Sequence, residues 1–266
     1  MWGSVLNDYL TPHLRDLPYF RALLRAVEAR FYEDISLPGP VLDLGCGDGH
    51  FASLAFQEPL DMGLDPWWGP IQEAGTRSSY QDLVCAEGDH MPYPSDYFSS
   101  AVSNSVLEHI PDLDPVIKET ARVLKPGAPF IFCVPNHRFL STLSISNGLD
   151  KIKLRGLADL YRGFFNRISR HYNCDSYETW KERLEKFGFM VEDSWDYFPP
   201  AALHVLEWGH YFGVPSWVAK LIFGRWILTP TRWNLFLADR LVRPHFESDP
   251  RSQDGVYSFY IARRIE

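Results

Sequence analysis

A glycine-rich turn after a short apolar segment is the part of this sequence best suited to binding a ligand. Residues 41–44 (VLDL) run directly into Gly45, Gly47 and Gly49, three glycines at alternate positions. Glycine allows a tight turn and lets the backbone approach a ligand closely. The helix expected next would present its N-terminus to a negative group such as a carboxylate or phosphate. The turn therefore predicts a small-molecule site.

Two classes of ligand compete for this turn. A dinucleotide fingerprint requires the spacing G-x-G-x-x-G or G-x-G-x-x-A. Counted from Gly45, its last position falls on His50, whose side chain is too large for the helix–strand contact required there. The spacing is G-x-G-x-G instead, with Asp43 two residues before the first glycine. A nicotinamide-dependent oxidoreductase is therefore disfavoured.

The turn and five later stretches resemble class I S-adenosylmethionine-dependent methyltransferases, especially the small-molecule enzymes related to ubiquinone and menaquinone synthesis. The turn resembles the first motif of that family. The other stretches follow in the family's order, which makes the resemblance more specific than a lone glycine-rich turn. They are Gly63-Leu64-Asp65, residues 87–93 (EGDHMPY), 97–110 (YFSSAVSNSVLEHI), 122–127 (RVLKPG) and 180–189 (WKERLEKFGF).

The resemblance implies S-adenosylmethionine as the cofactor and a role for each matching residue. Asp43 would face the ammonium of the cofactor, and backbone N–H groups would face its carboxylate. Asp65 would hold the ribose hydroxyls, and Asp89 would approach the adenine amino group. Cys46 would contribute backbone only, since a small residue suits that position. The complete set implied for cofactor binding is Asp43, Gly45, Cys46, Gly47, Gly49, Asp65, Pro66, Gly88, Asp89, His90 and Asn104.

Three histidines are candidates for a catalytic base on the acceptor side. His109 and His137 follow the fourth and fifth expected strands, where sheets of this kind bind ligands, and His171 precedes a later helix. A hydroxyl acceptor needs such a group, whereas a neutral amine or an activated carbon needs less help. In the resembling ubiquinone enzymes an E-x-x-E-H element is associated with a divalent metal. Ser105 stands at its first position here, so we predict no metal.

Some acceptors are disfavoured by missing elements. No D-P-P-Y or N-P-P-Y follows the fourth strand, which argues against methylation of a flipped base. No Pro-Cys follows it either, which argues against a covalent cytosine mechanism. The sequence predicts transfer to oxygen, nitrogen or carbon of a small hydrophobic molecule. A non-catalytic protein that binds S-adenosylmethionine is the alternative.

Apolar runs alternate with helical patterns along the chain, which predicts a parallel sheet with helices on both faces. The resemblance implies seven strands in the order 3-2-1-4-5-7-6, with strand 7 antiparallel, in a Rossmann-like doubly wound α/β fold. Helices are expected at 18–33, 50–57, 69–75, 112–124, 176–187, 216–226 and 233–242, and strands at 41–44, 61–64, 81–86, 97–103, 128–134, 189–195 and 255–263.

Two insertions divide the expected nucleotide-binding domain. That domain would comprise residues 38–137, 176–197 and 253–266, after an N-terminal helical segment at 1–37. Insertions at 138–175 and 198–252 would cap the acceptor site with helices. Residues 195–245 hold five of the nine tryptophans together with Lys220 and four arginines. Aromatic residues beside basic ones suit a hydrophobic acceptor pocket, a packed lid or a peripheral membrane contact through 201–245.

Composition sets the remaining limits. The chain has 266 residues, 45% hydrophobic, with 34 acids against 26 bases and a net charge of −8. This acidic balance argues against a general nucleic-acid partner. The four cysteines include no C-x-x-C pair, which favours a reducing cytoplasm. Residues 1–10 lack the pattern of a signal peptide, and no apolar run reaches spanning length. The oligomeric state is left open.

Overall fold

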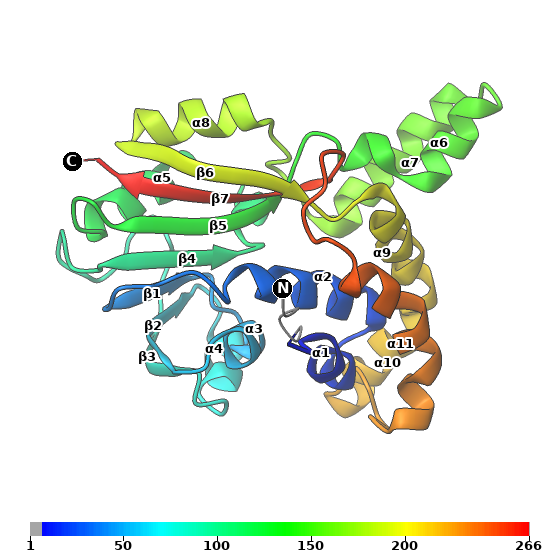
Figure 1. Cartoon of the computed structure of the whole chain (residues 1–266), viewed down its shortest axis with the longest axis horizontal. Helices are drawn as coiled ribbons and strands as arrows, with labels where there is room; N and C mark the ends of the chain where they lie inside the picture. Colours follow the sequence, from blue (N-terminus) through cyan, green and yellow to red (C-terminus); the bar gives the residue numbers. More distant parts are fainter. Residues whose placement is uncertain (1–6, 266) are drawn as a thin grey trace, which may run out of the picture.

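Seven strands form one sheet in the order β3-β2-β1-β4-β5-β7-β6 in the computed structural model, which describes residues 7–265 (Figure 1). Strand β7 is antiparallel to β5 and β6, and the other neighbouring pairs are parallel. The predicted fold class and strand order are confirmed. The strands are β1 (Val41–Leu44), β2 (Leu60–Asp65), β3 (Tyr80–Cys85), β4 (Ser100–Asn104), β5 (Pro129–Pro135), β6 (Phe189–Tyr197) and β7 (Tyr257–Arg264).

Helices lie on both faces of this sheet and beyond the carboxyl ends of its parallel strands (Figure 1). The α-helices are α1 (Leu10–Asp16), α2 (Tyr19–Phe31), α3 (His50–Ala55), α4 (Trp68–Ala74), α5 (Asp114–Val123), α6 (Ser144–Lys151), α7 (Arg155–Ser169), α8 (Tyr177–Lys186), α9 (Pro200–Phe212), α10 (Val214–Phe223) and α11 (Arg232–Glu247). Short 3-10 turns span Leu107–His109 and Leu140–Thr142.

The sheet separates two hydrophobic cores, and strand β5 contributes side chains to both. The seven residues of β5 are all buried, as expected for a strand covered on both faces. Ile131 and Cys133 face the core shared with α1, α2, α4, α9 and α11. Phe130, Phe132 and Val134 face the opposite core, which α5 and α8 complete. This alternation follows the two-residue period of a strand.

Four helices were not predicted individually, and one strand is shorter than predicted. Helices α1, α6, α7 and α9 have no counterpart among the helices predicted with bounds, although each lies in a segment that was expected to be helical. The predicted strand at 97–103 begins only at Ser100. The backbone N–H groups of Tyr97 and Phe98 both donate to the carbonyl of Val123, so these residues bind the end of α5 instead of continuing the β4–β5 ladder.

The two insertions are helical and are joined by a buried carboxylate. Residues 138–175 form α6 and α7, and residues 198–252 form α9, α10 and α11. Glu207 of α9 accepts hydrogen bonds from the backbone N–H groups of Ser144 and Ile145, at 2.6 and 3.1 Å, and from the Tyr161 hydroxyl at 2.8 Å. It therefore satisfies free N–H groups at the start of α6 and links the insertions. Among the described residues no helix is both long and apolar enough to cross a membrane.

Candidate active site

The loop between β1 and α3 requires glycine by its geometry. Gly45, Gly47 and Gly49 all have positive φ angles, of 81°, 55° and 71°. A Cβ atom at Gly45 would lie 2.3 Å from a methyl group of Val106. The N–H groups of Gly45 and Cys46 donate to the carbonyl of Leu64 at 2.7 and 3.0 Å, which fixes this loop to the end of β2.

Two buried carboxylates flank the glycine loop. The Tyr80 hydroxyl donates to Asp43 at 2.6 Å, and burial raises the pKa of Asp43 to about 6. Asp65, at the end of β2, accepts the N–H groups of Gly47 at 3.0 Å and Trp67 at 2.9 Å. Burial also raises the pKa of Asp65. One oxygen of Asp43 is thus already occupied by a protein hydroxyl, so a tyrosine that the sequence did not single out shares this predicted cofactor residue.

The remaining predicted cofactor residues lie around the same edge of the sheet. Asp65 is in register with Cys85, so Pro66 and the loop of Gly88, Asp89 and His90 follow neighbouring strands. A Cβ on Gly88 would lie 3.2 Å from Leu44 of β1, so this loop packs against the start of the glycine turn. The side chains of Asp89 and His90 are exposed, and Nδ1 of His90 lies 3.2 Å from Oδ1 of Asp89.

Helix α2 contributes a buried carboxylate, Glu28, that was not predicted from the sequence. Glu28 is fully buried and accepts from Arg25 at 3.0 Å, Asn104 at 2.6 Å, Ser105 at 2.8 Å and Tyr197 at 2.9 Å. Arg25 also donates to the backbone carbonyl of Asn104 at 3.1 Å. The predicted cofactor residue Asn104 is therefore held by α2. The sequence did contain one indication of this role, because Glu28 lies within the apolar stripe of α2. A charged residue that is buried at such a position needs hydrogen-bond or ion-pair partners.

A cluster of three titratable side chains lies after β4. Donor atoms of Glu108, His109 and His171 are all within 4.8 Å of one another. Glu108 is buried with one carboxylate oxygen unpartnered, and burial raises its pKa to about 8. Burial lowers the pKa of His171 to about 3 and also lowers the pKa of His109. At neutral pH burial thus favours an uncharged form of all three groups.

The third predicted histidine lies apart from this cluster. His137 is exposed after β5 and is not one of the three clustered groups. The structure thus brings together His109 and His171, with ring centroids 5.3 Å apart, and leaves His137 outside.

The cluster is also the one group within residues 7–265 with three potential metal ligands so close together. Its donor set is one carboxylate and two imidazoles. Ser105, which replaces a carboxylate of the resembling metal motif, donates to Glu28 at 2.8 Å instead of adding a ligand. The absence of a metal stays a prediction.

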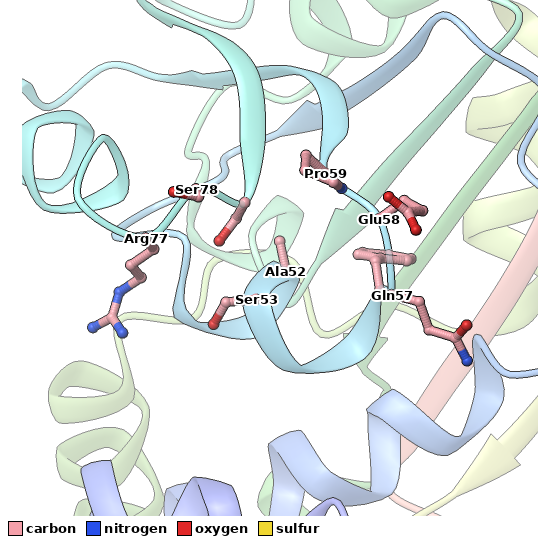
Figure 2. A pocket seen from close by; sticks show the side chains of 9 residues that line it. Ala52, Ser53, Gln57, Glu58, Pro59, Arg77 and Ser78 are labelled. Carbon is pink, nitrogen blue, oxygen red and sulfur yellow. The ribbon is translucent and has the colours of Figure 1, made fainter.

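A small polar cavity near the glycine loop is not suited to the cofactor. It has a volume of about 90 Å³ and lies between the end of α3 and the segment before β3, with Ser53, Glu58 and Arg77 in its lining (Figure 2). Arg77 donates to the carbonyl of Asp48 at 2.9 Å and so supports the glycine loop from behind. We assign this cavity no ligand.

Comparison with known proteins decides the family. A family profile described as "Methyltransferase domain" matches residues 13–194, more than half of the chain. The chain belongs to this methyltransferase family. The match includes the glycine loop, both flanking carboxylates and the Glu108 cluster, so the geometry above is that of a class I S-adenosylmethionine-dependent methyltransferase.

Curated relatives match part of this methyltransferase. It is 31% identical over 120 residues to the ubiquinone biosynthesis O-methyltransferase of Vibrio atlanticus (strain LGP32). The aligned region covers 42% of this chain and 50% of that relative. The methyltransferase therefore spans about half the length of the curated relatives it matches.

Solved structures share the fold at low identity. A possible histamine N-methyltransferase from Thermotoga maritima has a TM-score of 0.54 at 15% identity, covering 93% of this chain and 91% of its own. Phosphoethanolamine N-methyltransferase 2 from Haemonchus contortus, in complex with S-adenosyl-L-methionine, has a TM-score of 0.54 at 16% identity, covering 91% of this chain and 52% of its own. The methyl donor of this family, S-adenosylmethionine, is the cofactor of this enzyme.

Proposed function

We propose that this methyltransferase moves the methyl group of S-adenosylmethionine to a hydroxyl group of a small hydrophobic molecule. The observation that carries the proposal is the close cluster of Glu108, His109 and His171 after β4, where burial favours uncharged groups and the ring of Phe139 lies against His171. Methyl transfer displaces a sulfonium, so the protein mainly aligns the acceptor and excludes water. A hydroxyl acceptor must also lose its proton, which requires a nearby base.

His109 is the base that the geometry supports best. Its Nδ1 lies 3.0 Å from the backbone carbonyl of Arg170. Because a carbonyl only accepts, Nδ1 carries the hydrogen and Nε2 keeps a free lone pair. That Nε2 lies 3.9 Å from Glu108, and the side chain of His109 is 44% exposed, so an acceptor can reach it. The imidazolium that forms would in turn favour the ionised form of the neighbouring Glu108 carboxyl group, and that carboxylate would stabilise the cation.

The surroundings of the cluster favour a hydrophobic acceptor. The ring of His171 meets Phe139 at 4.9 Å, and Phe139 in turn lies 6.1 Å from Phe165 of α7. Phe165 lies 5.2 Å from His210 of α9. Both insertions thus contribute buried rings to the core that adjoins the cluster, and this apolar surrounding supports an acceptor with an aromatic or alkyl body.

On the cofactor side, Arg25 and Asp65 are the residues we propose to be decisive. Arg25 reaches from α2 to the carbonyl of Asn104, so its guanidinium lies at the carboxyl edge of the central strands. A bidentate cation there suits the carboxylate of the cofactor. Asp65 has the carboxylate that the ribose hydroxyls would need. Asp43, Asp89 and the other predicted cofactor residues remain proposals of the same kind.

The thiols support a proposal about the compartment. All four cysteines, Cys46, Cys85, Cys133 and Cys174, are free. We propose a reducing, cytoplasmic location, since disulfides form in oxidising compartments.

The test is methyl transfer from labelled S-adenosylmethionine to a panel of apolar phenols, the matching anilines, and small polar alcohols. We expect transfer to the phenols, with His109→Gln lowering kcat by about 10²–10⁴-fold. His137→Gln is the matched control and should leave kcat unchanged, because His137 lies outside the cluster. Transfer only to amines, with His109→Gln as active as wild type, would contradict the proposal, as would a preference for polar alcohols.

A further inference from the structure

Helix α7 presents an apolar face to solvent. Leu157, Leu160, Phe164 and Ile168 are all exposed, with exposed fractions from 40% to 69%. Their spacing of three and four residues places them on one side of the helix. The adjoining side of the helix buries Ala158 and Phe165. An amphipathic helix normally buries its apolar stripe, so this outward stripe needs an apolar partner outside the chain.

Helices α10 and α11 repeat this arrangement. Trp217, Leu221 and Phe223 of α10 are exposed, and Trp233 and Leu237 of α11 are 77% and 76% exposed. The two residues of α11 lie four positions apart, so they share a face. We call these five residues, together with the stripe of α7, the docking surface. Both parts lie at the end of the molecule beyond the carboxyl ends of the parallel strands, with α9 between them (Figure 1).

The docking surface is basic although the protein is acidic. Residues 151–170 hold six lysines and arginines against one aspartate, and residues 212–241 hold four against one, in a chain of net charge −8. Arg225, Arg232 and Arg240 are exposed and form no ion pair within residues 7–265. Positive charge and apolar side chains are thus concentrated at one end.

A pocket of about 390 Å³ adjoins this surface between α1 and α11. Arg15 and Arg232 line it, and neither forms an ion pair among the described residues, whereas the third arginine, Arg243, is held by Asp239 at 2.5 Å. Phe236, also in the lining, is 56% exposed. Two free guanidinium groups beside an apolar ring suit a phosphate group that carries an alkyl chain.

We propose that the docking surface binds an anionic phospholipid bilayer. Apolar side chains flanked by exposed arginines are the chemistry of interfacial helices. A second copy of the chain packed face to face would place basic surface on basic surface, which charge repulsion opposes. The binding itself does not depend on the acceptor proposed above.

The experiment is co-sedimentation of the full chain with vesicles of phosphatidylcholine, alone or mixed with phosphatidylglycerol. We expect binding to the mixed vesicles that weakens with added salt. Arg225→Gln with Arg232→Gln should weaken binding about thirtyfold, since each arginine near an anionic surface raises the affinity about fivefold. Trp233→Ser with Leu237→Ser should reduce it to the level seen with phosphatidylcholine alone.

Matched controls remove the same kinds of side chain, basic and exposed apolar, outside the docking surface. Lys118→Gln with Lys125→Gln removes two charges, and Tyr97→Ser with Met190→Ser removes two exposed apolar groups outside the docking surface. Both pairs should bind vesicles as wild type does. Absence of wild-type binding, or equal losses in the controls, would overturn the proposal. So would a dimer in light scattering that Trp233→Ser with Leu237→Ser dissociates, because the surface would then join two copies.

Discussion

At the scale of single residues, Glu28 is the buried charge on which the carboxyl edge of the sheet depends. It accepts hydrogen bonds from three side chains besides Arg25. Glu28→Ala would remove the shared hydrogen-bond acceptor of Asn104, Ser105 and Tyr197 and the ion-pair partner of Arg25, so we expect the free energy of unfolding to fall by about 3–5 kcal/mol. Urea unfolding measures this loss. Glu182→Ala, an exposed position on α8, is the control and should change stability by less than about 0.5 kcal/mol.

Glu108 predicts a pH dependence of stability with a definite sign. Burial raises its pKa to about 8 in the folded chain, from 4.5 for an ordinary glutamate. Between these values the folded chain binds a proton that the unfolded chain has released, so stability falls as the pH rises through this window, by at most about 1.4 kcal/mol per pH unit. Urea unfolding at both ends of the window should show the decline in wild type and a smaller one in Glu108→Gln.

Other groups near Glu108 do not obscure that comparison. His171, whose folded pKa is about 3 instead of 6.5, contributes the opposite slope below pH 6.5, because the unfolded chain binds the extra proton there. It is present in both proteins, as are Arg25 and Glu28, so the difference between them isolates Glu108. Equal slopes in both would show that Glu108 is ionised in the folded chain.

The site was predictable from sequence only where residues act through local geometry. Gly45 and Asp65 can be identified as candidates from the local sequence, because a tight turn and the end of a strand fix their surroundings within a few residues. Glu28 and Tyr80 were missed because their partners lie far away in the chain, Tyr197 for one and Asp43 for the other. Long-range pairing of this kind leaves only the weak signal of a polar residue in an apolar stripe.

At the scale of elements, the crossing of α9 over α2 is closer than side chains normally allow. A Cβ on Gly209 would lie 2.4 Å from the Cβ of Phe20. Gly209→Ala must separate the two helices, and we expect a loss of about 1–3 kcal/mol from overpacking, measured by thermal or urea unfolding. Gly163→Ala in α7 is the matched control. Nothing lies within 4 Å of a Cβ there, so helix propensity should stabilise that variant by up to about 1 kcal/mol.

Elements whose burial is decided by the sheet were predicted well, whereas an element that depends on distant contacts was missed. Strands β1 and β5 are short apolar runs whose burial is decided by the sheet alone, and their predicted bounds differ from the observed ones by no more than one residue. Helix α9 was missed because its apolar residues are not confined to one face. Its structure depends on α2 and on the Glu207 bonds to α6, which no local pattern reveals.

At the scale of the whole molecule, ligand binding should appear as stability. Any ligand that binds only the folded chain stabilises it, by about 2.7 kcal/mol at a hundredfold excess over Kd. For a chain of this size that corresponds to an increase in Tm of roughly 5–10 °C. We expect S-adenosylhomocysteine, which carries the same adenosine and amino-acid groups as the cofactor, to produce this increase in a thermal unfolding scan.

Two controls make that increase specific. NADH should leave Tm unchanged, since His50 occupies the position where a dinucleotide site needs a small residue and its ring lies 3.1 Å from Asp16. Asp65→Ala should reduce the increase produced by S-adenosylhomocysteine, each comparison being made against the same variant without ligand, because Asp65 also holds the N–H groups of Gly47 and Trp67. A larger increase with NADH than with S-adenosylhomocysteine would contradict the cofactor assignment. An increase with S-adenosylhomocysteine but no transfer to any acceptor would favour a protein that binds the cofactor without catalysis.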